Sequence, residues 1–477
     1  MGVGVSSWQL ARAVAQRGHL GVVSGTGTEA TLVRRLQDGD PGGHLRRSME
    51  RFPRPDVVAD VLRRYFLADG RPPGTPYRML PLLRRGADPW RQRLTMLSAF
   101  VEVDLAKHGH DGLVGMNLLT KIQLPTLPSL YGAMLAGVDV ILMGAGIPRE
   151  IPGALDALAA HQRCAIRFDV ELLPDGRSEQ LAFDPAEHWD GGAPPALRRP
   201  AFLAIIASNS LATVLARKAT GRVDGFVIEG PTAGGHNAPP RGEPRWNPRG
   251  EPLYGARDAV DLDKLRALGL PFWLAGGMGS PEQLVEAKAR GAAGIQVGTL
   301  FAFCDESGMT AALRRSVLAH ARSHELDVRT DPRASPTGYP FKVVAWPEDP
   351  AADAPRERVC DIGYLRVAYC APDGTIGYRC AGEPIDPYLA KGGHLEDTVG
   401  RRCLCNSLLA TIGLGQLRDG GVVEPPLVTS GDDLLAIDRF LGDRTSYTAS
   451  EVIAYLTSQP LRAASRPAGG GEADQLG

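Results

Sequence analysis

The sequence predicts an α/β fold built as a (β/α)8 barrel, and three observations carry that prediction. From the start of the chain to about residue 325, short apolar runs alternate with helical stretches. The runs are continuously apolar rather than alternating in polarity, which is typical of parallel strands covered on both faces. Seven strand-plus-helix units follow each other at fairly regular spacing, which favours a closed barrel over a doubly wound sheet.

The predicted strands are short and apolar, and the segments between them have helical character. The strands are predicted at residues 21–24, 112–118, 138–143, 201–207, 225–229, 271–275 and 294–298. A clear helix start precedes residues 281–290, because Ser280 can cap the helix and Pro281 suits its first position.

The first strand of the barrel is missing from this pattern. The chain opens with Met1-Gly2-Val3-Gly4, which is typical of the loop after a first strand, and continues into a helix at about residues 7–17. A barrel that lacks a strand exposes two unpaired sheet edges. Either the chain begins upstream of Met1 or another segment fills the gap, and we expect the former.

The remaining segments predict the domain organisation. We expect residues 1–330 to form the barrel, with an Arg-rich helical insertion at about 40–105. Residues 331–460 are Cys-, Gly- and Tyr-rich and are predicted to pack on the barrel, while the polar, Gly-rich residues 461–477 are predicted to be a disordered tail. The long loop at 235–255 is predicted to act as a lid, since loops of that length in compact domains are usually functional.

Composition and charge exclude several classes of protein. Lys+Arg number 53 and Asp+Glu 54, for a net charge of -1, which argues against a nucleic-acid-binding surface. No apolar run approaches the roughly 18 residues of a membrane span, and the start of the chain has no secretory signal pattern. The seven cysteines are an odd number, which favours reduced thiols. We therefore expect a cytoplasmic protein without nucleic-acid or membrane partners, and with a homodimer as a possible assembly.

Two glycine-containing strand ends late in the barrel predict a phosphate site. Gly276 and Gly277 follow one strand, and Gly298 and Thr299 follow the next. Glycine lets the backbone approach an anion closely, and a helix start directs N–H groups toward it. One such pair would be explained by a tight turn. Two at neighbouring barrel positions favour a phosphate site, because the loops after strands seven and eight commonly form one.

A histidine follows another strand end. The strand at 225–229 ends at Glu229, and the chain passes through Gly234 and Gly235 to His236. A neutral imidazole at this position can take a proton from carbon near neutral pH. A lone histidine is more often structural, but its place at the carboxyl end of a strand after two glycines favours catalysis.

Together these motifs resemble the nitronate monooxygenase family, formerly called 2-nitropropane dioxygenases. The similar motifs are Gly-Gly-His at 234–236, Ala-Gly-Gly-Met at 275–278 and Val-Gly-Thr-Leu-Phe at 297–301, and the resemblance extends over most of residues 1–325. It implies a TIM-type barrel that binds flavin mononucleotide (FMN). The same motifs are found in the related FabK-like enoyl reductases, so they are less specific for substrate.

The resemblance also implies roles for individual residues. His236 matches the catalytic base that removes the α-proton of a nitroalkane, and for a nitronate it would orient and stabilise the anion. Asn117 matches an asparagine that reaches the flavin. The residues expected to bind FMN are Gly2, Asn117, Glu229, Gly234, Gly235, Gly276, Gly277, Gly298 and Thr299.

The sequence departs from the family pattern beside the histidine. The family usually has Gln-Gly-x-Glu-Ala-Gly-Gly-His, whereas here Glu229 stands at the Gln position and Thr232 at the Glu position. A carboxylate near a flavin disfavours an anionic reduced flavin unless it is protonated or paired. The motif therefore does not predict the same charge environment around the flavin as in the family.

The cysteines of the C-terminal region raise the question of a metal. They are Cys360, Cys370, Cys380, Cys403 and Cys405, with His394 nearby. Such clusters can hold zinc or iron–sulfur centres, but there is no Cys-x2-Cys pair and the spacings match no common metal motif. We predict no metal site, and expect these cysteines to be small buried residues that include at most one redox-active pair.

Three functions are compatible with these features. The first is FMN-dependent oxidation of alkyl nitronates, or of a related small acidic-carbon substrate, by O2 to a carbonyl product and nitrite. The second is an NAD(P)H-dependent FMN enoyl reductase of the FabK-like or polyketide-associated kind, and the third is a barrel that binds a phosphorylated ligand without turnover. His236 and the long loop argue against the third, and oxidation of NAD(P)H separates the second from the first.

Overall fold

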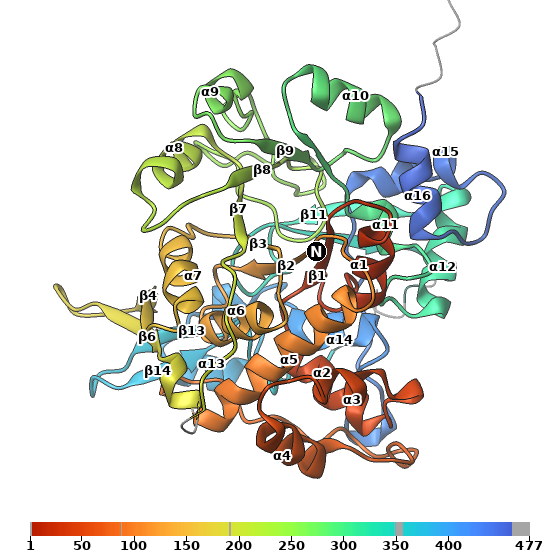
Figure 1. Cartoon of the computed structure of the whole chain (residues 1–477). Coiled ribbons are helices and arrows are strands. Elements are labelled where there is room, and N and C mark those ends of the chain that lie inside the picture. Colours follow the sequence, from red (N-terminus) through yellow and green to blue (C-terminus); the bar gives the residue numbers. More distant parts are fainter. Residues whose placement is uncertain (1, 87, 190–191, 348, 350–355, 460–477) are drawn as a thin grey trace, which may run out of the picture.

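The chain folds around a curled sheet of seven parallel strands, with helices on its outer side (Figure 1). The computed structural model describes residues 2–459 except 87, 190–191, 348 and 350–355. The strand order follows the chain: β1 (Gly21–Ser24), β2 (Val114–Leu119), β3 (Val140–Gly144), β7 (Ala201–Ile206), β8 (Gly225–Glu229), β9 (Phe272–Ala275) and β10 (Gly294–Gln296). All seven predicted strands are present, and the sheet is consistent with a TIM-type barrel, so the predicted α/β barrel class is confirmed.

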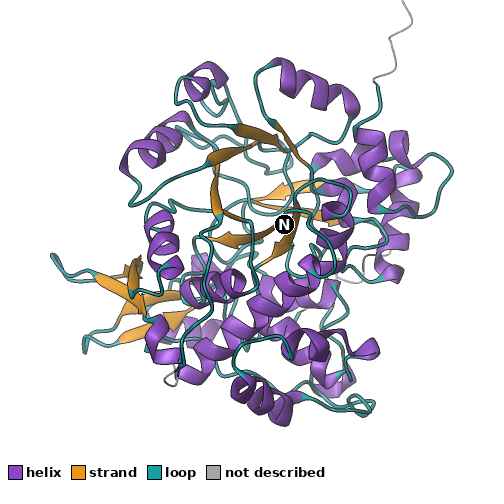
Figure 2. Ribbon diagram, viewed as in Figure 1, coloured by secondary structure: helices purple, strands orange, loops and turns teal. Residues whose placement is uncertain are grey.

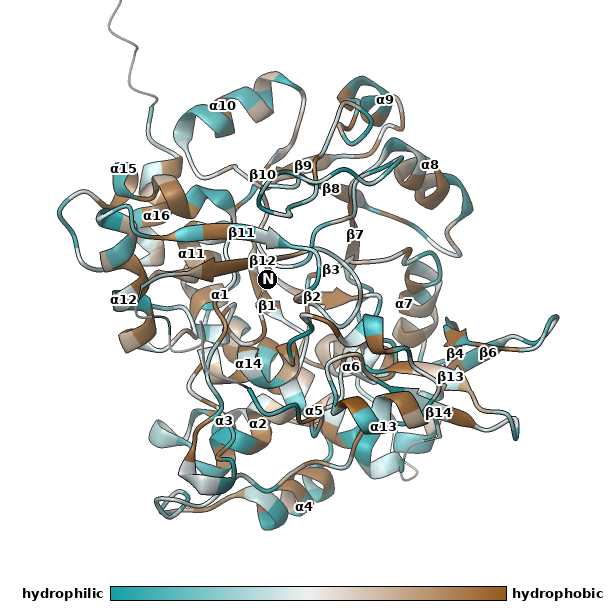
Figure 3. Cartoon of the chain, turned by 180° about the vertical axis from the view of Figure 1, so that it is seen from behind, coloured by the Kyte–Doolittle hydropathy of each residue, from teal (hydrophilic) through white to brown (hydrophobic). Residues whose placement is uncertain are grey.

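The sheet is buried because helices cover its outer face and its strands are apolar (Figure 2). Phe202, Phe226 and Phe272 occupy three neighbouring strands, and each is less than 2% exposed. Figure 3 shows hydrophobic colour on strands such as β7, and both hydrophobic and hydrophilic colour on the outer helices. The barrel helices are α1 (Trp8–Ala15), α2 (Thr28–Gln37), α6 (Thr126–Leu135), α7 (Ile151–Ala159), α8 (Asn209–Lys218), α9 (Leu262–Arg266) and α10 (Pro281–Ala289). Ser280 caps α10 as predicted, because its side chain accepts a hydrogen bond from the Gln283 backbone.

The predicted gap in the barrel lies between β1 and β10, which are the two edges of the sheet. Within the described residues no eighth strand joins them. The turn before α1 lies against β1 instead: the Ser24 N–H donates to the Ser6 carbonyl at 2.9 Å, and the Ser6 hydroxyl donates to the Val22 carbonyl at 2.6 Å. The N-terminal segment therefore takes up part of the gap.

Residues 40–105, expected to be a helical insertion, contain several helices. They are η1 (Pro41–Gly43), α3 (His44–Met49), α4 (Pro55–Tyr65) and most of α5 (Pro89–Lys107). The long helix α5 is buried on most sides because α6 packs on one side and α1 to α4 pack on the others. This helix therefore connects the predicted insertion to the barrel wall.

The remaining elements, from residues 164–188 and from residue 299 onward, form small sheets and helices outside the seven-stranded sheet. The hairpin of β11 (Asp327–Asp331) and β12 (Phe341–Ala345) is antiparallel, and β13 (Val367–Cys370) pairs with β14 (Ile376–Arg379) and with β5 (Val170–Glu171). A further hairpin joins β4 (Cys164–Phe168) to β6 (Glu179–Phe183). The other elements are η2 (Pro185–His188), α11 (Thr299–Ala302), α12 (Ala311–Arg322), α13 (Ile385–Ala390), η3 (Leu395–Thr398), α14 (Leu404–Thr411), η4 (Asp419–Gly421), η5 (Asp432–Ala436), α15 (Asp438–Leu441) and α16 (Ala449–Leu456).

The C-terminal helices are held to the barrel by a shared hydrophobic cluster. Phe303 after α11, Val317 of α12 and Val452 of α16 are all fully buried in it. In the part of the chain that is described, no helix combines the length and apolar character needed to cross a membrane. The predicted tail at 461–477 lies outside the described residues.

Candidate functional site

A cavity of about 850 Å³ lies at the carboxyl ends of the barrel strands. Parallel strands bring their carboxyl ends to one edge of the sheet, so residues that follow different strands meet there. The cavity is lined by all ten site residues expected from the sequence: Gly2, Asn117, Glu229, Gly234, Gly235, His236, Gly276, Gly277, Gly298 and Thr299. The C-terminal region supplies the opposite wall, including Tyr339, Phe341 and Leu408.

The glycine-containing segments that follow β9 and β10 lie on one side of the cavity. Gly276 and Gly277 have φ values of 84° and 68°, in the left-handed region that favours glycine. A Cβ atom on Gly276 would lie 3.0 Å from the Ala233 nitrogen, so a larger residue would displace the chain. A Cβ atom on Gly298 would meet no atom within 4 Å. We call these two strand ends, 276–279 and 298–299, the glycine cradle.

A segment of the C-terminal region, residues 429–433, closes the glycine cradle from the far side. The Gly431 N–H donates to Oγ1 of Thr299 at 3.1 Å, and the Gly235 N–H donates to Oγ1 of Thr429 at 2.8 Å. The carboxyl group of Asp433 accepts a hydrogen bond from the backbone of Gly279, and burial together with nearby Asp432 raises its pKa to about 6. The sequence analysis missed this segment.

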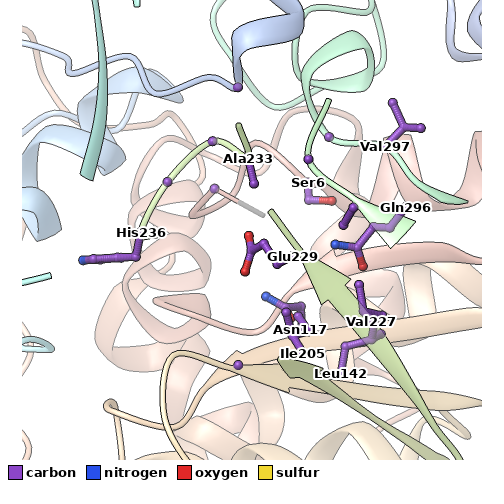
Figure 4. Close-up of a pocket in the computed structure, with 18 of the residues that line it drawn as sticks. Ser6, Asn117, Leu142, Ile205, Val227, Glu229, Ala233, His236, Gln296 and Val297 are labelled. Carbon is purple, nitrogen blue, oxygen red and sulfur yellow. The ribbon is translucent and has the colours of Figure 1, made fainter. Parts of the chain in front are cut away.

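Asn117, within β2, and Glu229, the last residue of β8, lie together in the cavity. Figure 4 shows the Glu229 carboxyl group beside the Asn117 amide. The Asn117 Oδ1 atom is buried without a hydrogen-bond partner, and Glu229 has none among the described residues. Burial raises the pKa of Glu229 to about 7, so a substantial fraction of this carboxyl group is protonated at neutral pH.

His236 lies on the side of the cavity formed by the C-terminal region. Its Nε2 atom is 2.6 Å from Oγ of Ser335, and its ring meets the Phe341 ring edge-on at a centroid distance of 4.8 Å. Figure 4 shows the ring directed away from Glu229. Burial, and to a lesser degree the charge of Lys121, lowers the pKa of His236 to about 4. The imidazole is therefore neutral at physiological pH.

The loop after His236, predicted to be a lid, is anchored along β11. Asn247 donates to the Glu251 carboxylate at 2.8 Å, the other Glu251 oxygen accepts from the Thr330 N–H at 2.9 Å, and Arg249 pairs with Asp327. The parts of the loop that line the cavity are its two ends, at 236–241 and 254–258. The middle of the loop therefore packs on β11 and contributes nothing to the cavity wall.

The seven cysteines are free thiols. Cys405 lines the cavity from α14, and burial raises the pKa of its thiol well above the usual value. Cys360 makes a side-chain hydrogen bond with Cys380, and this contact together with burial raises its pKa. Among the residues that the structure describes, no group of three or more His, Cys, Asp and Glu side chains is placed to hold a metal ion.

The curled parallel sheet carries the glycine cradle and the neutral His236 at its carboxyl edge. This is the place where TIM-type barrel enzymes have their active sites. Residues 195–332 match the model of a protein family described as nitronate monooxygenase. This segment contains β7 to β11, His236 and the whole glycine cradle. The resemblance inferred from the sequence is confirmed over this segment, and the match supports an oxidoreductase as the class of enzyme.

Comparison with solved structures finds distant similarities. FabK from Thermotoga maritima has 14% sequence identity and a TM-score of 0.46, covering 94% of this chain and 88% of that chain. A nitroalkane oxidase from Streptomyces ansochromogenes has 13% identity and a TM-score of 0.43, covering 96% and 92%. The enoyl reductase domain of MlnA from Bacillus amyloliquefaciens has 13% identity and a TM-score of 0.35, covering 72% and 62%. No curated protein sequence matches the chain.

Proposed function

We propose that the protein binds FMN and oxidises alkyl nitronates, or a related small acidic-carbon substrate, with O2 to a carbonyl product and nitrite. The observation that carries this proposal is that the glycine cradle and the neutral His236 line one cavity. The family match over residues 195–332 supports the same class of reaction.

The residues of the cavity fit FMN. The glycine cradle offers backbone N–H groups beside open space at Gly298, which suits a phosphate. The orphaned Oδ1 of Asn117 is a buried acceptor that an N–H group of a flavin ring can satisfy. The volume of about 850 Å³ leaves room for a substrate next to the cofactor. When bound, FMN supplies the electron transfer, which no side chain of the cavity can perform.

The side chains around His236 favour an anionic or acidic-carbon substrate. Because His236 is neutral, it can accept a proton from a nitroalkane. The ammonium group of Lys121 lies 3.7 Å from the centre of the Tyr339 ring and close enough to His236 to affect its pKa. A positive charge near His236 favours an anion over a neutral group on this side of the cavity. The apolar side chains of Phe341 and Leu408 exclude water from this side.

A second candidate is the NAD(P)H-dependent enoyl reductase. One observation favours it: the wall formed by the C-terminal region is apolar, with Leu365, Leu404 and Leu408 along one side of the cavity. Such a wall can accommodate an acyl chain as well as a short alkyl group.

The two candidates are distinguished by the visible absorbance of the FMN-reconstituted protein under anaerobic conditions. Propionate 3-nitronate is added to one sample, and NADH or NADPH to another. Loss of flavin absorbance with the nitronate supports the oxidation that we propose. Loss with the pyridine nucleotide alone supports the reductase. A protein that cannot be reconstituted with FMN contradicts both.

A further inference from the structure

The segment that follows β11 contributes two neighbouring hydroxyl groups, of which the first contacts His236. Oγ of Ser335 lies 2.6 Å from Nε2 of His236 and 2.8 Å from Oγ1 of Thr337. The Thr337 N–H donates to Oγ of Ser335 at 3.2 Å, and the Tyr339 N–H donates to Oγ1 of Thr337 at 3.4 Å. Backbone groups therefore hold both hydroxyl oxygens in place.

The chain on both sides of this pair is also fixed to the histidine segment. The Asn237 N–H donates to the Pro340 carbonyl at 2.9 Å, and the Lys342 N–H donates to the Gly235 carbonyl at 2.9 Å. Phe341, between these contacts, packs edge-on against the His236 ring. Ser335 is fully buried, so its hydroxyl has no access to water and must use these protein partners.

The other ring nitrogen of His236 has no such partner. Nδ1 makes no hydrogen bond with any described residue, and it is not among the buried atoms that lack a partner. His236 is among the residues that line the cavity, and Nδ1 is the ring nitrogen that no described residue occupies. Which of the two nitrogens carries the proton depends on the direction of the hydrogen bond at Nε2.

We propose that Ser335, held by Thr337, is the positioning residue of His236: it accepts a hydrogen bond from Nε2–H and leaves the lone pair of Nδ1 facing the cavity as the base. In this arrangement the Ser335 hydroxyl donates to Oγ1 of Thr337, and the half-buried Thr337 hydroxyl is free to donate to water. This inference rests on the proposed function for its choice of proton position, because a base needs its lone pair on the side of the substrate.

The same arrangement also serves the protonated state. When Nδ1 takes the proton from carbon, both ring nitrogens carry hydrogen, and Nε2–H still requires an acceptor. Ser335 already accepts it, so no hydroxyl group has to turn during the transfer. The opposite arrangement, in which Ser335 donates to Nε2, would have to reverse before the imidazole could be protonated.

The position of the proton is measured directly by long-range ¹H–¹⁵N NMR on protein labelled with ¹⁵N-histidine. The signals of His236 are identified by their absence in His236→Gln. We expect the neutral Nε2–H form in the wild type, and a mixture of the two neutral forms in Ser335→Ala. A proton on Nδ1 in the wild type would overturn the assignment. The measurement needs no turnover, so it decides the point even if the protein oxidises no nitronate.

Kinetics test whether the contact matters for proton removal. For Ser335→Ala we expect kcat/KM for neutral nitroethane to fall about tenfold or more, and kcat/KM for ethyl nitronate to change much less. Ser335→Thr keeps a hydroxyl and should restore part of the loss, while Ser307→Ala, at a buried serine outside the cavity, should have no effect. An Ser335→Ala variant that keeps its FMN and the wild-type pH profile with nitroethane would overturn the proposal. Failure of the proposed function has a different signature, since the wild type would then not be reduced by the nitronate at all.

Discussion

The backbone N–H of Gly431 donates to Oγ1 of Thr299 at 3.1 Å, across 132 positions of sequence. A Cβ atom on Gly431 would lie 2.7 Å from the Thr232 carbonyl, and a Cβ atom on Gly234 would lie 2.7 Å from the Gly431 nitrogen. Glycine is therefore needed on both sides of this contact. The glycine cradle depends on the C-terminal region as well as on the barrel strands.

Alanine at Gly298 tests the cradle without disturbing the fold. Its Cβ atom would meet no atom within 4 Å, so we expect the melting temperature of Gly298→Ala to stay at the wild-type value. The added methyl group enters the open space beside the cradle, and we expect the Kd for FMN to rise about tenfold, or about 1.4 kcal/mol. Quenching of FMN fluorescence measures the Kd. Wild-type affinity in Gly298→Ala would argue against a phosphate at this position.

Alanine at Gly431 should behave differently because its Cβ atom has no room. We expect Gly431→Ala to lower the melting temperature and to weaken FMN binding together, since segment 429–433 must move away from Thr232 and Thr299. Gly192→Ala, at an exposed glycine with open space around it, is the matched control. A Gly431→Ala variant that lost neither stability nor affinity would show that the segment does not support the cradle.

Much of the barrel and of its site could be predicted from the sequence, because the signals are local. A buried parallel strand leaves a continuous apolar run, and the glycines and His236 stand directly after such runs. The parallel arrangement then brings the strand ends to one edge, so residues as distant as Asn117 and Thr299 line one cavity. No contact between them had to be known in advance.

The contribution of the C-terminal region could not be predicted in the same way. Ser335 lies 99 positions from His236, and Thr429 lies 194 positions from Gly235. Single hydroxyl groups that reach across such distances leave no periodic pattern in the chain. Thr232, noted only as a departure from the family motif, has its hydroxyl against the Gly276–Gly277 turn, and its carbonyl accepts from the Asp432 N–H at 3.0 Å. The position of Thr232 therefore depends on segment 429–433 as well.

Glu229 should make the stability of the ligand-free protein depend on pH. Burial raises its pKa from 4.5 to about 7, so its favourable contribution is fully present below pH 4.5 and is lost as the pH rises through 7. The free energy of unfolding of the wild type, relative to Glu229→Gln, should fall over this range by up to about 3 kcal/mol. Urea unfolding at several pH values measures both proteins. A difference that does not vary with pH would contradict the burial of a titrating carboxyl group.

A buried contact joins the C-terminal region to α2. The Tyr364 hydroxyl donates to the Glu29 carboxylate at 2.7 Å, and Thr95 of α5 donates to the other oxygen at 2.9 Å. Tyr364→Phe leaves one buried oxygen without this donor, and we expect a loss of about 1–3 kcal/mol in the free energy of unfolding. Tyr369→Phe, whose hydroxyl makes no hydrogen bond among the described residues, serves as the control. Equal stability of the two variants would show that the contact is not maintained in solution.

The role of His236 is tested by comparing a substrate that must lose a proton with one that already has. In His236→Ala, kcat/KM for neutral nitroethane should fall at least 100-fold, because the loss of a general base costs about that much. Ethyl nitronate needs no base, so its kcat/KM should fall much less. Because the pKa of His236 is about 4, the imidazole is already deprotonated above pH 5, and wild-type activity with nitroethane should not decline between pH 8 and pH 5 through this group. The FMN content of each variant is measured alongside, to show that the cofactor is retained. Equal losses with the two substrates would mean that His236 binds or orients both, and that the proton goes to another group.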